Sequence, residues 1–185
     1  MKHFVQRFAS VAAMLASAVA AVAAPTPTFP GPAFPVFKGA ADLTQRCQAG
    51  LTQAKARQRQ MERHKPDARW LASADRFYGW MDDTSGPLVF VSNVHPDKAV
   101  RDASEACEQR WQQFNSSLFQ SEALYKAAKQ AKATDAIDRQ ALQDLVDAFE
   151  DSGVGLPPTE RAKAKQLQDR INLLGQQFGK NVRDD

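Results

Sequence analysis

The segment Asn93-Val-His-Pro-Asp-Lys-Ala-Val-Arg101 opens the longest stretch of helical pattern in this 185-residue chain. Proline is tolerated in a first helical turn, and an aspartate beside it complements the positive end of the helix dipole. Apolar residues then recur at steps of three and four, as on one buried helix face: Val100, Ala103, Cys107, Trp111, Phe114 and Leu118. The segment therefore predicts a long helix that supplies one side of a core.

Two more helices are expected upstream. The first has Asp42 as a plausible cap and buries residues at helical spacing: Leu43, Cys47, Leu51, Ala54 and Met61. The second covers about 67–82 and ends in the turn-forming residues 82–87, Asp-Asp-Thr-Ser-Gly-Pro. The apolar run 88–91 that follows fits strand or helix, but it has no partner strand, so we prefer a short buried helical turn.

Three further helices are expected downstream. Ser121 can cap the first, and the second carries an apolar face up to the stop at Ser152-Gly-Val-Gly155: Leu142, Leu145, Val146 and Phe149. The last begins at Pro157-Pro158 and runs through an apolar series: Leu167, Ile171, Leu174 and Phe178. Six or so antiparallel helices predict an all-α bundle.

The first 23 residues have the features of a secretory signal peptide. A positive start precedes the apolar stretch 8–22, and Ala21-Val-Ala23 provides a small-x-small cleavage site. This stretch is shorter than the ~20 residues that span a bilayer. Residues 24–37 form a proline-rich linker or arm, whose Phe29 and Phe34 suggest that it packs back on the helical domain, residues 38–185. The mature protein is expected to be periplasmic or secreted, without membrane association.

Composition and charge are those of an ordinary globular protein. Hydrophobic residues make up 43% and charged residues 24% of the chain. The net charge is only +3, and Lys2 and Arg7 in the leader contribute two of those charges. No nucleic-acid partner is therefore expected.

Cys47 and Cys107 can pair in an exported chain or remain as buried thiols. Both lie on predicted apolar stripes. A bridge between them would require Cα atoms within about 7 Å. We therefore prefer burial as small hydrophobic residues, and no nucleophilic role is expected without a neighbouring base.

Several segments, taken in order, resemble the N-terminal helical region of the thimet oligopeptidase family of zinc metallopeptidases. They are Asn93 to Asp97, Val100-Arg101, the helix through Phe114, Leu142 to Phe149, Gly155-Leu-Pro157 and Phe178-x-x-Asn181. The resemblance runs from about Leu43 to the C-terminus. It implies a helical wall of a substrate channel, in which a His-Glu-x-x-His helix elsewhere holds the zinc that cuts peptides.

This sequence contains no His-Glu-x-x-His, so no catalytic, cofactor-binding or metal-binding residue is assigned. Zinc is expected only in the full-length family. His64 and His95 are interpreted as loop or cap residues. The carboxylate pairs Asp82-Asp83, Glu150-Asp151 and Asp184-Asp185 are interpreted as solvated ends. The basic residues are interpreted as an exposed helix face: Lys55, Arg57, Arg59, Arg63 and Lys65.

These observations favour an N-terminal fragment of an exported zinc-dependent oligopeptidase, inactive by itself. Its expected partner is a separately made C-terminal half. Short peptides are expected to bind only when that catalytic portion is present. The alternative is an independent helical module of the cell envelope that binds peptides or proteins. If the domain is cut short, Leu174 and Phe178 of the last helix should be partly exposed and favour self-association.

Overall fold

The computed structural model describes residues 34–184, which form six α-helices and no strand. The helices are α1 (Ala40–Arg63), α2 (Trp70–Val94), α3 (Lys98–Leu118), α4 (Glu122–Gln130), α5 (Ala136–Asp151) and α6 (Pro158–Asp184). The predicted all-α class is thus confirmed. The expected signal peptide, Phe29 and Asp185 lie outside the described residues. Within residues 34–184, no helix is long and apolar enough to cross a membrane.

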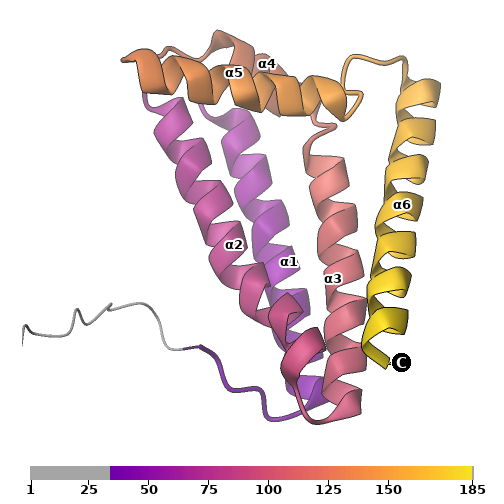
Figure 1. The fold of residues 1–185 in the computed structure, drawn as a ribbon. Coiled ribbons are helices and arrows are strands. Elements are labelled where there is room, and N and C mark those ends of the chain that lie inside the picture. Colours follow the sequence, from indigo (N-terminus) through magenta and orange to yellow (C-terminus); the bar gives the residue numbers. More distant parts are fainter. Residues whose placement is uncertain (1–33, 185) are drawn as a thin grey trace, which may run out of the picture. The chain divides into compact units, whose positions relative to one another are not determined.

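The core lies among α1, α2 and α3, which pack side by side, while α4 and α5 lie across one end of them (Figure 1). The predicted faces of α1 and α3 are buried, apart from Leu51 and Ala103, which are partly exposed. The largest fully buried side chains come from α1, α2, α3 and α5: Leu43, Trp70, Val100, Leu118 and Phe149. Helical spacing therefore identified most of the core correctly.

A disulfide joins Cys47 of α1 to Cys107 of α3, with Cα atoms 5.9 Å apart. Both cysteines are buried, as expected, but the preferred free thiols were wrong. Because α1 and α3 pack face to face, the two cysteine positions on their apolar stripes meet within bridging distance. The spacing of residues along one helix does not indicate which of its positions will contact another helix.

The second helix is longer than predicted, because α2 continues through Pro87 and ends at Val94. Proline has a backbone φ close to the helical value and removes one hydrogen bond, so burial on one face can offset the loss. Leu88 and Val91 provide it, continuing the buried series of Phe77 and Met81 at helical steps. Residues 88–91 are helical as preferred, but they are no separate turn, and the exposed pair Asp82-Asp83 lies inside a helix.

Capping side chains explain where several helices begin. The Asp97 carboxylate accepts a hydrogen bond from the Ala99 amide, 2.8 Å away, and Ser121 caps α4 as predicted. Asp42 is not the N-cap of α1, which is Gly39. Asp42 instead lies in the first turn and accepts a hydrogen bond from the Lys38 amide at 3.0 Å. A carboxylate there satisfies a free amide and complements the helix dipole.

The described end of the proline-rich arm packs on the helices, as expected for Phe34. Its ring meets the edge of Phe90 in α2, with ring centroids 5.6 Å apart. Phe37 is buried, and the Arg46 guanidinium lies 5.5 Å from the centre of its ring. Aromatic burial and a cation–π contact thus hold this segment against α1 and α2.

Candidate functional site

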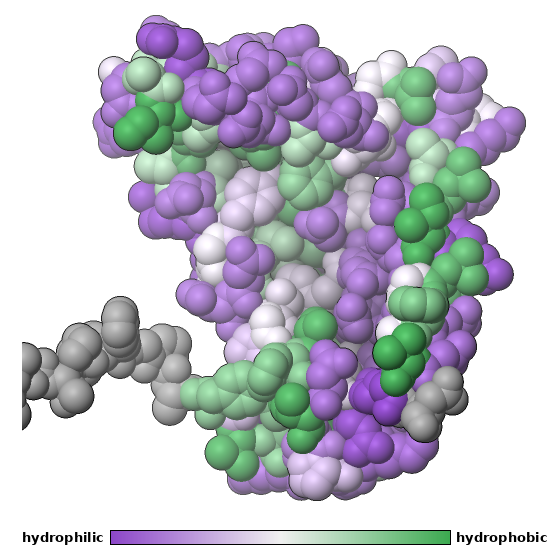
Figure 2. Space-filling view, viewed as in Figure 1, coloured by the Kyte–Doolittle hydropathy of each residue, from purple (hydrophilic) through white to green (hydrophobic). Residues whose placement is uncertain are grey.

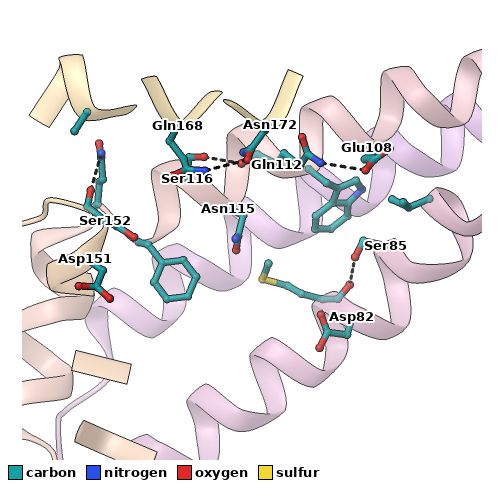
Figure 3. Close-up of a pocket in the computed structure, with 16 residues that line it drawn as sticks. Asp82, Ser85, Glu108, Gln112, Asn115, Ser116, Asp151, Ser152, Gln168 and Asn172 are labelled. Atoms are coloured by element: carbon teal, nitrogen blue, oxygen red, sulfur yellow. Dashed lines mark hydrogen bonds between the residues drawn. The ribbon is translucent and has the colours of Figure 1, made fainter. Parts of the chain in front are cut away.

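An open groove of about 610 Å³ lies among α2, α3 and α6 and the end of α5 (Figure 3). Helix α2 contributes Asp82 and Ser85, and α3 contributes Trp111. The polar lining is completed by α3, α5 and α6 residues: Glu108, Gln112, Asn115, Ser116, Asp151, Gln168 and Asn172. Side chains from helices far apart in the sequence therefore converge on one groove, which apolar residues such as Trp111 and Phe119 also line.

Helix α6 docks on α3 through long polar side chains. The Gln176 amide donates to the Glu105 carbonyl at 2.9 Å and to the Glu108 carboxylate at 2.8 Å. The Gln109 amide donates to Gln176 at 2.6 Å. Polar side chains meet through their tips, in contrast to the interdigitated side chains of an apolar interface. This leaves a hollow between the helices.

The Glu105 carboxylate is the charged centre of the α3–α6 interface. Lys180 contacts one of its oxygens at 2.8 Å and Arg183 the other at 2.7 Å. Burial raises the pKa of Glu105, but hydrogen bonds from Lys180 and Arg183 outweigh it and hold the pKa below its usual value. Arg183 also donates to the Ser92 carbonyl at 2.9 Å, which ties α6 to α2.

Glu105→Gln should weaken the docking of α6 on α3. At neutral pH the free energy of this docking should fall by about 1–2 kcal/mol, because hydrogen bonds to charged groups contribute about that much. Because the pKa of Glu105 is lower in the folded state than in the unfolded state, its carboxylate stabilises the folded state above the unfolded-state pKa of about 4.3. This stabilisation is lost as the pH falls through the folded-state pKa. Hydrogen exchange of α6 amides should therefore show this contribution at pH 7 and its loss in strong acid. Glu160→Gln, an exposed change in α6, is the matched control. Equal protection in Glu105→Gln and wild type at pH 7 would contradict this role.

The groove offers donors and acceptors suited to a peptide. Gln112 donates to Glu108 at 3.0 Å and Gln168 to Asn172 at 3.0 Å, so these amides retain unused donor and acceptor positions. The side chains of Asp82, Asn115 and Asp151 are exposed, and no hydrogen bond joins them to another described residue. Carboxamides can pair with an extended peptide backbone, and free carboxylates can attract a cationic group.

The serine hydroxyls of the groove are engaged by the backbone. The hydroxyls of Ser85, Ser116 and Ser152 donate to carbonyl groups four residues earlier, at 2.8, 3.0 and 2.8 Å. None of these serines is accompanied by a histidine, because His64 and His95 do not line the groove. An activated serine needs a base within hydrogen-bond reach.

The two described histidines cap helices, in agreement with their interpretation as loop or cap residues. His64 follows α1, where its Nδ1 lies 3.0 Å from the Lys65 carbonyl oxygen. His95 follows α2 and its Nδ1 accepts a hydrogen bond from the Asp97 amide at 3.1 Å. Since α1 and α2 run in opposite directions, their C-terminal ends lie far apart (Figure 1). Across residues 34–184, no three His, Cys, Asp or Glu side chains are grouped to hold a metal.

The predicted charged surfaces are placed largely as expected. The five basic residues 55, 57, 59, 63 and 65 are exposed, although Lys65 lies beyond the last residue of α1. One of them is engaged, because the Arg57 guanidinium lies 4.2 Å from the ring centre of Trp80. Glu150 at the end of α5 accepts a hydrogen bond from the Tyr125 hydroxyl at 2.6 Å.

Sequence reasoning missed the groove residues on α3 and α6. A signal was present, because Gln168, Asn172 and Gln176 recur every four residues and so share one face of α6. Gln109 and Gln112 similarly lie near each other on α3. Amides concentrated on one face of each of two helices could have indicated a polar interface between them.

Comparison with known proteins gives a limited but consistent result. No protein-family model matches the chain. It is 26% identical to oligopeptidase A of Escherichia coli K12 over 114 residues, covering 56% of the chain and 17% of that relative. It is 29% identical to the thimet-like oligopeptidase of Dictyostelium discoideum over 107 residues, covering 53% of the chain and 16% of the relative. The chain is similar to oligopeptidases.

Oligopeptidase A of Salmonella typhimurium LT2 gives the same picture, with 26% identity over 120 residues, 62% of the chain and 17% of the relative. The chain thus spans about a sixth of the length of these oligopeptidases. The resemblance noted in the sequence is supported at the level of oligopeptidases, over roughly half of the chain.

Proposed function

We propose that this chain is the exported, non-catalytic helical region of an oligopeptidase-type zinc metallopeptidase, corresponding to its N-terminal part and forming a wall of the substrate channel. The observation that supports the proposal most is the similarity to oligopeptidases over 53–62% of the chain. The aligned length is a small share of those relatives, as expected if the chain corresponds to one region of them.

The residues present do not fit a zinc site of the family's kind. Such a site needs two histidines one helical turn apart and a third ligand nearby. His64 and His95 follow different helices that end at opposite ends of the bundle. In this proposal the metal and the hydrolytic step belong to a catalytic portion that this chain does not contain.

The role left to this chain is to present a polar surface to peptides. Gln112 on α3 lies beside Gln168 and Asn172 of α6 in the groove, and Asn115 of α3 also lines it (Figure 3). Carboxamides both donate and accept hydrogen bonds, so they can pair with peptide backbones of different sequence. A surface of this kind is suited to short unstructured peptides, whose backbone groups are free to pair.

Export is part of the proposal, and the disulfide supports it. Structural disulfides form and persist in oxidising compartments and are rare in the cytosol. The Cys47–Cys107 bridge is buried between α1 and α3, where a structural bridge is expected. A periplasmic or secreted location accounts for both the bridge and the N-terminal leader pattern.

An independent peptide-binding module of the cell envelope is the alternative. The groove favours it, because residues of the described helices and of the turns between them line it. In that case the mature chain would bind short peptides by itself. Trp111 lines the groove, so a change in its fluorescence would report such binding.

The purified mature chain with added zinc should not hydrolyse a quenched fluorescent peptide. The physical reason is that its histidines lie too far apart to hold a metal together, and its groove serines have no base. Turnover should remain at the no-protein rate with and without a chelator. The proposal would be contradicted by chelator-sensitive cleavage that is absent from the His64→Ala/His95→Ala variant. That variant lacks both described imidazoles.

The reading frames downstream in the DNA provide a second check. A His-Glu-x-x-His motif encoded there would favour the oligopeptidase region. Its absence, together with saturable peptide binding by the chain alone, would favour the independent module.

A further inference from the structure

Helix α6 presents two different sides. One side carries exposed apolar side chains, which Figure 2 shows along the helix. Leu174 is 46% exposed and Phe178 is 71% exposed, which confirms their expected exposure, while the self-association expected with it stays a prediction. The other side contacts α3 through Gln176 and lines the groove of Figure 3 with Gln168 and Asn172. This second side lies where several helices meet around a cavity.

The groove carries negative charge that the described residues do not balance. Three helices each contribute one carboxylate to its lining, namely Asp82 from α2, Glu108 from α3 and Asp151 from α5. No lysine, arginine or histidine among residues 34–184 lines it. No ion pair joins any of the three carboxylates to a described residue. We call this groove the acidic groove.

The negative charge is local to the acidic groove. A second groove of about 430 Å³ lies among α1, α3 and α6, and its charge is the opposite. Lys55, Arg110 and Lys165 line it, and no aspartate or glutamate of the described chain does. Charges act on one another over about 8 Å at physiological ionic strength. A cationic ligand is therefore drawn to the acidic groove and repelled by the second groove.

Neutral amides orient the Glu108 carboxylate without neutralising it. One of its oxygens accepts a hydrogen bond from the Gln112 amide at 3.0 Å, and the other accepts one from the Gln176 amide at 2.8 Å. Each carboxylate oxygen has two lone-pair positions, so each keeps one for a ligand. Because the two amides already hold this carboxylate in place, it loses little freedom when it binds a cation.

Apolar side chains lie beside the carboxylates, because Met81, Trp111 and Phe119 line the same groove. The stems of arginine and lysine cover apolar surface of this kind while their charged ends stay in polar surroundings. Trp111 is 5% exposed, and its indole N–H is buried without an acceptor among the described residues. Buried donors are nearly always paired, so a side chain of the groove wall carries an unused donor. A peptide carbonyl is an acceptor of the kind that it needs.

We propose that the acidic groove binds short extended peptides that carry at least two basic side chains, a preference that rests on the peptide-binding role proposed above. The amides of Gln112 and Gln168 pair with the peptide backbone, while Asp82, Glu108 and Asp151 receive the cationic side chains. The volume of about 610 Å³ lies within the ~300–1,000 Å³ of ligand pockets. Peptides without basic side chains gain no ion pair and bind more weakly.

The length of the acidic groove explains why more than one basic side chain is required. Glu108 lies ten residues before the end of α3 at Leu118, which is about 15 Å at 1.5 Å per residue. Just beyond that end, Gln120 donates to the Ser152 carbonyl at 3.0 Å, so Asp151 lies far along the groove from Glu108 (Figure 3). About five extended residues at ~3.3 Å each cover this length. Separate carboxylates along it receive separate cations.

Fluorescence anisotropy of the purified chain at about 150 mM salt tests the preference, with alanine pentapeptides blocked at both ends and carrying an uncharged dye. Arginine at the second and fourth positions should give about tenfold tighter binding than glutamine there, since each exposed ion pair contributes modestly and two act together. Asp82→Asn/Asp151→Asn should reduce this preference to below about threefold. Both side chains are exposed, so circular dichroism should show an unchanged fold.

The matched control is Asp75→Asn/Asp144→Asn, which removes two exposed charges from the same two helices outside the acidic groove and should keep the tenfold preference. Equal affinity for the two peptides would overturn the inference and leave peptide binding itself standing. A preference that survives Asp82→Asn/Asp151→Asn, or that the control loses equally, would also overturn it. If neither peptide binds, the proposed peptide-binding role of the groove fails together with the inference.

Discussion

Replacing Cys47 and Cys107 with alanine should lower the free energy of unfolding by about 4 kcal/mol. The bridge closes a loop across 60 residues and ties α1 to α3. Without it, the unfolded chain gains conformations that the closed loop forbids. Both positions are buried among apolar residues, so alanine adds no buried polar group.

Urea unfolding with and without reductant measures this contribution. Reductant should destabilise the wild type towards the level of the double-alanine variant and leave that variant unchanged. The variant in the absence of reductant is the control for side effects of the reductant. A loss below about 1 kcal/mol in both comparisons would show that the bridge contributes little, which the chain-entropy account does not allow.

Phe149→Ala should destabilise the protein by about 3–5 kcal/mol, the range for removing a buried aromatic ring. Phe149 of α5 is fully buried. Its ring centroid lies 5.3 Å from that of Phe119 and 6.2 Å from that of Tyr125, so it joins α5 to α4 and to the end of α3. Alanine would leave a cavity where these three elements meet.

Thermal and urea unfolding of Phe149→Ala should be compared with Ile137→Ala in the same helix. Ile137 is 79% exposed, so its replacement should change stability by less than about 0.5 kcal/mol. Hydrogen exchange should show the loss of protection first in α4 and α5. Similar stabilities of the two variants would mean that α5 contributes little to the cooperative fold.

The helices themselves could be predicted because their signals are local. Asp97 and Ser121 accept hydrogen bonds from amides two and three residues later, and the stripe from Val100 to Leu118 repeats within a single helix. Such patterns depend on residues within one or two turns. The misplaced end of the second helix shows where local reasoning fails. Burial of Leu88 and Val91 against the neighbouring helices outweighs the turn signal of Gly86-Pro87.

The sequence by itself determined that the chain is helical, where α3, α4 and α6 begin and which side of α1, α3 and α5 is buried. Only the tertiary structure decided which of those sides meet. It paired Cys47 with Cys107, brought Asn115 and Asn172 to one groove and turned Phe178 outward. The physical reason is that periodicity describes one helix, whereas contacts between helices depend on how all of them pack together.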